Sequence, residues 1–365
     1  MARIGVNALY LIPGGVGGAE IYLRELLAAL AAMDTTNEYF VFTNLETGQD
    51  LTPRQANFHW KQQAVHAAFR PARILWEQTV LPLETWRYGL DVLFNPGFTV
   101  PLAARCPSVT TFHDLQHKRH PEHFRWFDLP FWRFLLWAAA HRSRRLIAVS
   151  EATRADLLRF YRLPADRVTV IPHGVNPQFL TLDRSHIEPF FLCVSTLHPH
   201  KNLERLVRAY ARKPREHKLV LAGLRGFQTA AIEALIAELG IAERVGIPGW
   251  LPRADLMRLY EKADAFVYPS TFEGFGMPVL EAMAAGIPVA CSHIPALREV
   301  GGEAALFFDP LNEDALAAAL DRITSDADLR RTLAAAGPER ARPFTWRRTA
   351  ERTLAALLDA QARGT

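Results

Sequence analysis

The chain has 365 residues, 49% of them hydrophobic and 22% charged, which excludes a disordered chain and predicts two domains instead of one. The formal net charge is +4, and the first 172 residues carry the whole excess, so this half favours anionic partners such as phosphates or acidic lipid. The three cysteines lie far apart in the sequence, which indicates free thiols in a reducing compartment and argues against a zinc site.

The first half of the chain alternates apolar strands with helical or polar stretches. A glycine-rich turn over 12–20 precedes a predicted helix over 21–33. Alternation of this kind predicts a mostly parallel sheet with helices on both faces. The expected strands cover 3–11, 38–44, 91–97, 108–114, 145–151 and 167–176.

A second series of the same kind follows a polar stretch over 176–188, which we interpret as a linker with the boundary near Asp183. We predict an N-terminal Rossmann-like domain over 1–180 and a C-terminal one over 187–345. Residues 346–365 then form an amphipathic helix that caps the second domain or crosses back to the first. The expected strands of this series are 189–196, 217–223, 244–250, 264–270, 287–292 and 304–310, and the expected helices are 202–212, 228–240 and 253–263.

Two acids flank a glycine-rich turn in the segment STFEGFGMPVLEAMAAGIPV, residues 270–289. Glu273 follows a predicted strand, and Gly274 lets the backbone turn tightly and bring its N–H groups close to a ligand. Pro278 suits the first position of a helix, which places Glu281 one turn further on. Carboxylates accept paired hydrogen bonds from vicinal diols. The alternative is a turn residue and an acid near a helix end, and the spacing alone favours neither reading.

The stretch EGFGMPVLEAMAAGIPVA resembles the Glu-x7-Glu signature of retaining glycosyltransferases of family 4, which have the GT-B fold. The resemblance extends over most of the chain and implies an α/β fold of two doubly wound domains that face an interdomain cleft. It also implies that Glu273 contacts the transferred sugar and that Glu281 holds the ribose of a nucleotide. The backbone amides of Phe275, Gly276 and Met277 would line the sugar and phosphate side.

A lysine follows another predicted strand, in STLHPHKNLERL. Lys201 stands beside a helix that opens at Asn202, where the cation and the helix dipole both favour phosphate. A fixed cation would also stabilise a departing nucleoside diphosphate. The family often adds an arginine nearby, whereas this chain has Thr196 there; His198, His200 or a residue of the other domain would have to replace it. An ordinary surface lysine is the alternative.

The first strand leads into PGGVGGAE, a glycine-rich turn. Gly15, Gly17 and Gly18 do not complete a GxGxxG pattern because Glu20 occupies its last place, so a dinucleotide site is a poor match. The family resemblance implies that amides of this loop approach the donor phosphate and the acceptor. A plain strand-to-helix turn is the alternative.

His113 follows the predicted strand over 108–114 and resembles the donor-facing histidine of the family, so we assign it to sugar contact. The spacing from His113 to His117 is a weak zinc pattern because it begins in a loop. Asp326 and Asp328 have the form of a metal-binding DxD, but they fit a helix start equally well. We therefore predict no metal. We expect the backbone near Trp250 and Leu251 to recognise the base of the nucleotide, so the side chains do not identify that base.

The stretch over 124–145 is rich in aromatic and basic residues. It fits a peripheral contact with an anionic membrane that carries a lipid-linked acceptor, and it equally fits a buried helix. The longest apolar run, 131–140, is far shorter than the roughly 20 residues of a membrane span, and no signal peptide is visible. We expect a cytoplasmic location, at the inner face of the membrane.

These features together predict a metal-independent retaining glycosyltransferase that needs no cofactor and binds no nucleic acid. It would move a hexose from a nucleotide-diphosphate sugar to a glycan or lipid-linked acceptor in polysaccharide biosynthesis. The stretch over 73–97 is similar to relatives that build bacterial polysaccharides, often mannosyltransferases. Three alternatives stay open: a sugar phosphorylase, a nucleotide-sugar epimerase of the same fold, and a non-catalytic nucleotide-sugar-binding protein.

Overall fold

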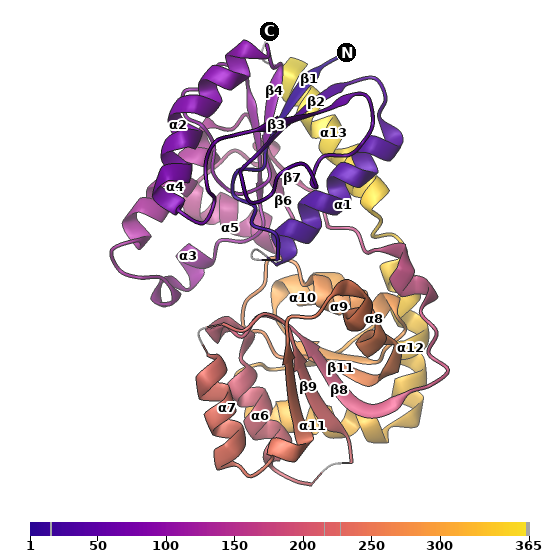
Figure 1. The fold of residues 1–365 in the computed structure, drawn as a ribbon. Helices are drawn as coiled ribbons and strands as arrows, with labels where there is room; N and C mark the ends of the chain where they lie inside the picture. The colour runs from indigo at the N-terminus through magenta and orange to yellow at the C-terminus, as the bar shows by residue number, and fades with distance from the viewer. Residues whose placement is uncertain (15–16, 215, 227, 363–365) are drawn as a thin grey trace. The chain divides into compact units, whose positions relative to one another are not determined.

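The computed structural model describes residues 1–14, 17–214, 216–226 and 228–362. The chain forms two compact units: unit 1 comprises Met1–Gly174 and the segment from Trp346 onward, and unit 2 comprises Val175–Thr345 (Figure 1). The chain thus leaves unit 1 just before the polar stretch that the sequence indicates as a linker. Each unit holds one parallel sheet with helices, so the predicted α/β class with two doubly wound sheets is confirmed.

The sheet of unit 1 has seven parallel strands in the order β3-β2-β1-β4-β5-β6-β7. The order reverses between β1 and β4, which makes this pair the topological switch point of the sheet. The strands are β1 (Arg3–Asn7), β2 (Glu38–Thr43), β3 (Phe58–Gln62), β4 (Val92–Asn95), β5 (Ser108–Phe112), β6 (Arg145–Ala148) and β7 (Val168–Val170).

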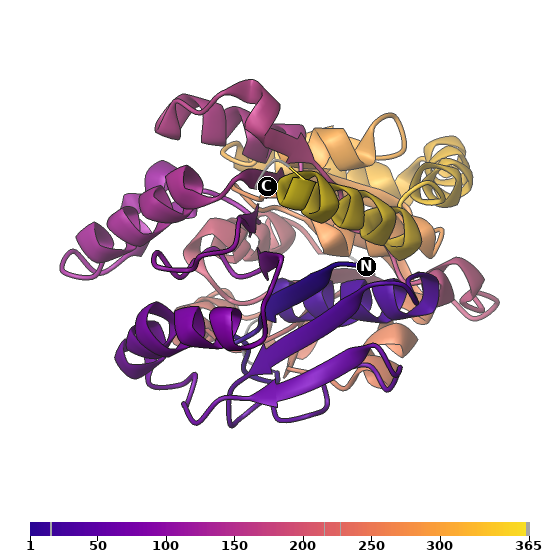
Figure 2. The same ribbon diagram turned by 90° about the horizontal axis from the view of Figure 1, so that it is seen from above.

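Helices cover the sheet of unit 1, and the C-terminal helix is one of them. It packs beside α1 in Figures 1 and 2, and Thr349 on it donates a hydrogen bond to the carbonyl of Pro172 at 2.8 Å. Arg145 at the start of β6 is ion-paired with Asp359 on the same helix. The helices are α1 (Gly18–Met33), α2 (Arg70–Arg87), α3 (Gln116–Arg119), α4 (Leu129–Arg142), α5 (Glu151–Tyr161) and α13 (Trp346–Ala362).

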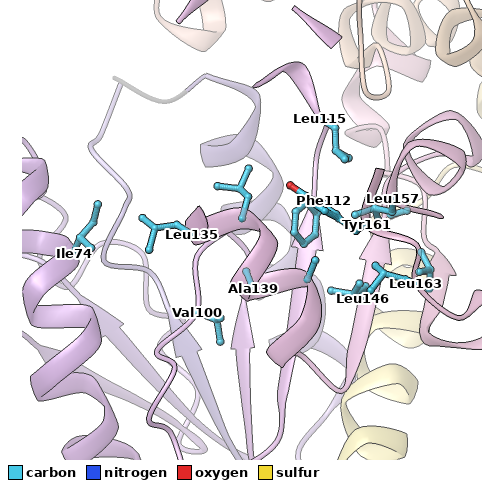
Figure 3. Packing of buried hydrophobic residues seen from close by; sticks show 14 residues of the cluster. Ile74, Val100, Phe112, Leu115, Leu135, Ala139, Leu146, Leu157, Tyr161 and Leu163 are labelled. Atoms are coloured by element: carbon cyan, nitrogen blue, oxygen red, sulfur yellow. The ribbon is translucent and has the colours of Figure 1, made fainter. Parts of the chain in front are cut away.

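The core of unit 1 forms where α4 and α5 lie against the strands. Leu135 and Ala139 of α4 pack toward Phe112 of β5 and Leu146 of β6 (Figure 3). Leu135 and Ala139 are four residues apart and therefore lie on one face of α4. Burying that face stabilises both the helix and its position on the sheet. The packing fixes the loops that follow β5 and β6.

The sheet of unit 2 has six parallel strands in the order β10-β9-β8-β11-β12-β13, with its switch point between β8 and β11. The strands are β8 (Glu188–Val194), β9 (Lys218–Ala222), β10 (Val245–Gly249), β11 (Ala263–Tyr268), β12 (Val289–Ser292) and β13 (Leu306–Phe308). The helices are α6 (Leu203–Ala211), α7 (Thr229–Glu238), α8 (Arg253–Lys262), α9 (Met277–Ala284), α10 (Pro295–Gly301), α11 (Glu313–Ser325) and α12 (Ala327–Ala341).

The structure differs from the sequence expectations at the first strand and at the sheet edge. The strand expected over 3–11 ends at Asn7, because the amide of Asn44 binds the carbonyls of Leu9 and Leu11 and holds them in a turn. The edge strand β3 was not predicted. The three cysteines are free and buried, which confirms the prediction of free thiols. None of the helices in the described ranges combines the length and the apolar character that a membrane span requires.

Candidate active site

The switch point of unit 2 brings together the loops that follow β8 and β11. The two strands pair directly, so their carboxyl ends open side by side at one edge of the sheet. Open α/β sheets bind ligands at this place, because the loops diverge there. Lys201 lies in the loop after β8 and Glu273 in the loop after β11, and the structure therefore brings both predicted site residues to the switch point.

The ammonium group of Lys201 contacts Glu273 directly. Its Nζ lies 2.6 Å from Oε1 of Glu273 and 3.2 Å from the hydroxyl of Tyr268, and the two charged side chains are only 13% and 12% exposed. Burial raises the pKa of Tyr268 well above its usual value, and the charge of Glu273 acts in the same direction. An ammonium group has three donors, so Lys201 retains capacity for a further acceptor such as a phosphate oxygen.

Glu281 lies on α9 and accepts a hydrogen bond from Tyr260 of α8. The distance from the Tyr260 hydroxyl to Oε2 is 2.9 Å, and the tyrosine is fully buried. Burial raises the pKa of Tyr260 well above its usual value, with the Glu281 charge adding to the effect, so the phenol stays a donor. Sequence reasoning missed Tyr260 and Tyr268, because a tyrosine that is buried on a helix or strand is most often a core residue.

The turn between the two acids depends on Gly276. This residue caps α9 with φ 103°, and a Cβ added there would lie 2.4 Å from Cδ2 of Leu297. Met277 begins the helix and Pro278 is its second residue, which corrects the predicted first position. The correction costs no hydrogen bond, because the first four N–H groups of a helix have no partner within it. Phe275 is buried, which anchors the turn.

Asn202 fastens the loops at this edge to one another. It lies in the left-handed region with φ 57° and caps α6, which begins at Leu203, one residue after the predicted start. Its side-chain amide donates to the carbonyls of Pro269 at 3.0 Å and Pro310 at 2.8 Å. The carbonyl of His200 accepts from the N–H of Thr271 at 2.8 Å. Lys201 therefore stands on a loop that is held from two other loops.

Thr196, Trp250 and Leu251 also lie at the carboxyl edge of the unit 2 sheet. Thr196 follows β8, and the other two follow β10. Trp250 is 58% exposed, and a hydrogen bond from the N–H of Gly223 to the carbonyl of Gly249 at 3.0 Å joins the loop after β9 to the last residue of β10. Contact of these residues with the donor stays a prediction.

His113 lies just beyond the carboxyl end of β5 in unit 1. Its Nε2 is 2.9 Å from the carbonyl of Pro96, so Nε2 carries the proton and Nδ1 has the acceptor lone pair. Burial lowers the pKa of His113 to about 4, which leaves the ring neutral at neutral pH. His173 stacks on it at 5.5 Å between ring centroids, and Tyr22 meets both rings edge-on. Sequence reasoning missed His173, although it too follows a strand.

The glycine-rich loop enters α1 through Gly17, which caps the helix with φ 57°, and Gly18 is the first helical residue. Glycine at this cap avoids the strain that another residue would meet at a positive φ. Gly15 lies outside the described residues. Contact of this loop with a donor phosphate stays a prediction.

The residues whose spacing suggested metal ligands bind other groups of the protein. His117 is buried, and its Nε2 lies 2.8 Å from the hydroxyl of Tyr161, whereas His113 binds a carbonyl. Asp326 caps α12 by accepting from the N–H of Leu329 at 3.0 Å, which confirms the helix start. Within the described ranges, one group of three potential ligands lies close together: His120, Glu122 and His123. The absence of a metal stays a prediction.

Comparison with known proteins places the chain in a family. Residues 16–179 match the family model described as Glycosyltransferase Family 4, and residues 182–340 match the one described as Glycosyl transferases group 1. O-antigen chain mannosyltransferase B of Escherichia coli is 31% identical over 279 residues, which cover 72% of this chain and 73% of the relative. The chain belongs to glycosyltransferase family 4.

Solved structures similar to this family 4 glycosyltransferase agree on its fold. Sucrose-phosphate synthase of Thermosynechococcus elongatus is 22% identical, with a TM-score of 0.80 over 100% of both chains. The Anabaena protein HepE, crystallised in complex with UDP-glucose, is 20% identical, with a TM-score of 0.77 over 98% of this chain and 100% of that one. The chain has the GT-B fold that the sequence resemblance implied.

Proposed function

We propose that this glycosyltransferase moves mannose from a nucleotide-diphosphate sugar to a glycan or lipid-linked acceptor in polysaccharide biosynthesis. The observation that carries the proposal is the buried contact of Lys201 with Glu273 at the switch point, beside the Glu281 helix. The similar O-antigen mannosyltransferase supports the choice of sugar and acceptor class, and the structure of HepE with UDP-glucose supports the donor class.

Each site residue has a proposed role. Lys201 binds the diphosphate, because a lysine with an unused donor is a fixed positive charge for phosphate oxygens. Glu273 accepts hydrogen bonds from hydroxyls of the sugar, and Glu281 accepts them from the ribose. Backbone amides from Gly274 to Met277 approach the sugar and phosphate. His113 contacts the sugar as an acceptor through its neutral Nδ1.

The proposed reaction retains the anomeric configuration. The bond from the anomeric carbon to the diphosphate oxygen breaks, and the acceptor hydroxyl forms the new glycosidic bond on the same face. The proton of that hydroxyl passes to the departing diphosphate, whose charge Lys201 stabilises. NMR of the product tests this step: a product with the anomeric configuration of the donor is expected, and the opposite configuration would overturn it.

A thermal-shift screen with GDP-, UDP- and ADP-sugars tests the donor. We expect the sugars of one nucleotide to raise the melting temperature most, which identifies the base. Lys201→Ala should lower kcat at least tenfold, because it removes the charge that stabilises the departing diphosphate. Glu281→Ala should mainly weaken donor binding, because it removes the contact with the ribose. Both expectations hold whichever sugar is transferred. Unchanged kinetics in both variants would reject the assignments. Orthophosphate-dependent turnover would instead indicate a phosphorylase, and epimer formation without acceptor an epimerase.

We also propose that the outer face of α4 contacts an anionic membrane that presents the acceptor. Leu135 and Leu136 are buried, whereas Phe131, Phe134 and Trp137 are 49%, 54% and 48% exposed. Exposed aromatic rings beside basic residues favour a membrane interface. Flotation with phosphatidylglycerol vesicles should recover the protein, and replacement of Phe134 and Trp137 by serine should release it. Failure of the wild-type protein to float would exclude the contact.

A further inference from the structure

A cavity of about 410 Å³ lies at the opposite edge of the unit 1 sheet from His113. Its walls come from three segments that directly precede β5, β6 and β7, at the amino ends of these strands. The length of β5, five residues, separates the two edges by about 16 Å. The lining residues are Arg105, Cys106, Pro107, His141, Arg142, Ser143, Arg144, Arg145, Asp166 and Arg167.

The lining carries an excess of positive charge. Five arginines face one carboxylate of the lining, Asp166, and a second carboxylate, Asp359, pairs with Arg145. Arg142 and Arg167 donate to main-chain carbonyls of the loop before β5 and of the last turn of α4. Carbonyls satisfy these hydrogen bonds but do not neutralise the guanidinium charges. The cavity therefore holds like charges close together, and a bound anion would relieve their repulsion.

Three of the five guanidinium groups are accessible to a ligand. Arg105, Arg142 and Arg144 are exposed, whereas Arg145 and Arg167 are partly buried. Within the part of the chain that the structure describes, the side chain of Arg105 makes no hydrogen bond or ion pair. Planar guanidinium groups bind phosphate through paired hydrogen bonds, which makes arginine the favoured residue for such groups.

A second cavity of about 270 Å³ adjoins the first and shares Arg105, Cys106 and Pro107 with it. Its other walls include Leu90 and Trp86, and the indole is 67% exposed. A ligand that spans both cavities would place a charged group among the arginines and a less polar group against the tryptophan.

We propose that the two cavities together form a site for a phosphate ester, with the phosphate held by Arg105, Arg142 and Arg144 and the ester group lying against Trp86. Such a phosphate belongs either to a lipid headgroup or to a free phosphorylated metabolite. The site lies on unit 1 at the amino ends of the strands, away from the carboxyl edges that carry the proposed donor site. It does not depend on the proposed function.

Calorimetric titration with two matched ligands tests the site. Dihexanoyl phosphatidic acid and glycerol 3-phosphate carry the same phosphate, and only the first has acyl chains. We expect at least one to bind, and the joint replacement Arg105→Gln with Arg144→Gln to weaken binding at least tenfold. Arg54→Gln, which removes an exposed arginine elsewhere in unit 1, should leave the affinity unchanged. Lys201→Ala should also leave it unchanged, which separates this site from the donor site.

The two ligands distinguish the sources of the phosphate. Tighter binding of the lipid, lost in Trp86→Ala, assigns the site to a headgroup, and equal binding of both ligands assigns it to a free ester. The proposal is overturned if neither ligand binds at about 10 mM, or if the double arginine variant, with unchanged circular dichroism, binds as tightly as the wild type.

Discussion

At the scale of single residues, the contact between Lys201 and Glu273 links the stability of the site to ligand binding. Both side chains are nearly buried, so each charge relies on the other in place of water. A diphosphate that binds Lys201 would take over part of the role of the carboxylate. The pair therefore couples the stability of the site to its occupancy.

Glu273→Gln should lower the free energy of unfolding by about 1–3 kcal/mol, because it leaves the Lys201 ammonium without its counterion. A nucleoside diphosphate should then raise the melting temperature of this variant more than that of the wild type, since it restores a negative partner. Urea denaturation and thermal shift measure the two effects. Glu188→Gln is the control, because its pair with Lys262 is about half exposed and should contribute under 1 kcal/mol.

The pH dependence of stability tests the burial of His117. Burial lowers its pKa to about 4, helped by the charges of Lys118 and Arg133, while in the unfolded chain it titrates near 6.5. The unfolded state therefore binds a proton first, so stability is complete above pH 6.5 and falls as the pH drops toward 4. His117→Gln should remove up to about 3 kcal/mol of this fall in urea titrations. The exposed His186→Gln should follow the wild type, and identical curves for all three proteins would contradict the account.

The sequence indicates candidate residues where a charged side chain follows a strand. Lys201 and Glu273 were singled out in this way, and Glu281 by the Glu-x7-Glu motif, whereas their hydrogen-bond partners were not expected. Tyr268 and Tyr260 contribute only a hydroxyl to the site. Tyr268 lies in a strand that is buried throughout, whereas Tyr260 is the buried residue of the largely polar helix α8. The spacing of residues within one segment does not show a hydrogen-bond partner that comes from another element.

At the scale of elements, the start of α9 depends on one backbone conformation. Gly276 has φ 103°, and an added Cβ would come within 2.4 Å of the Leu297 side chain. Gly276→Ala should therefore cost about 1–3 kcal/mol of stability and weaken donor binding, because the turn carries both acids. Gly246→Ala is the matched control in β10, where a Cβ would meet no atom within 4 Å. Equal melting temperatures of both variants would refute the argument.

Most strands could be predicted because parallel strands that are buried on both faces give continuous apolar runs, and here these runs alternate with helical stretches. The edge strand β3 was missed, since FHWKQ has only Phe58 fully buried and reads as a polar loop. The expected first strand was too long because the apolar run continues into a turn that Asn44, far along the chain, stabilises. Tertiary contacts of this kind are not visible in a local window.

At the scale of the whole molecule, unit 1 is completed by the last helix of the chain. The sequence left open whether this helix caps unit 2 or returns, since its amphipathic pattern fits any apolar surface. The structure has it against α1, with Trp346 6% exposed beside Tyr22 and His173. The C-terminal segment thus supports the ring cluster around His113.

Trp346→Ala should destabilise unit 1 by about 3–5 kcal/mol, because it leaves a cavity under the ring cluster. The loss should appear as an earlier unfolding transition by circular dichroism. Trp126→Ala removes an indole that is 83% exposed and should change stability by less than about 0.5 kcal/mol. Equal losses in the two variants would show that α13 does not support unit 1.

The most direct test of the proposed function is a crystal structure of the enzyme with its nucleotide-diphosphate sugar. We predict Lys201 Nζ within about 3 Å of a diphosphate oxygen, and a carboxylate oxygen of Glu281 within about 3 Å of a ribose hydroxyl. Glu273 should then contact the sugar. A donor bound elsewhere, with Lys201, Glu273 and Glu281 all outside hydrogen-bonding distance of it, would contradict the assignment.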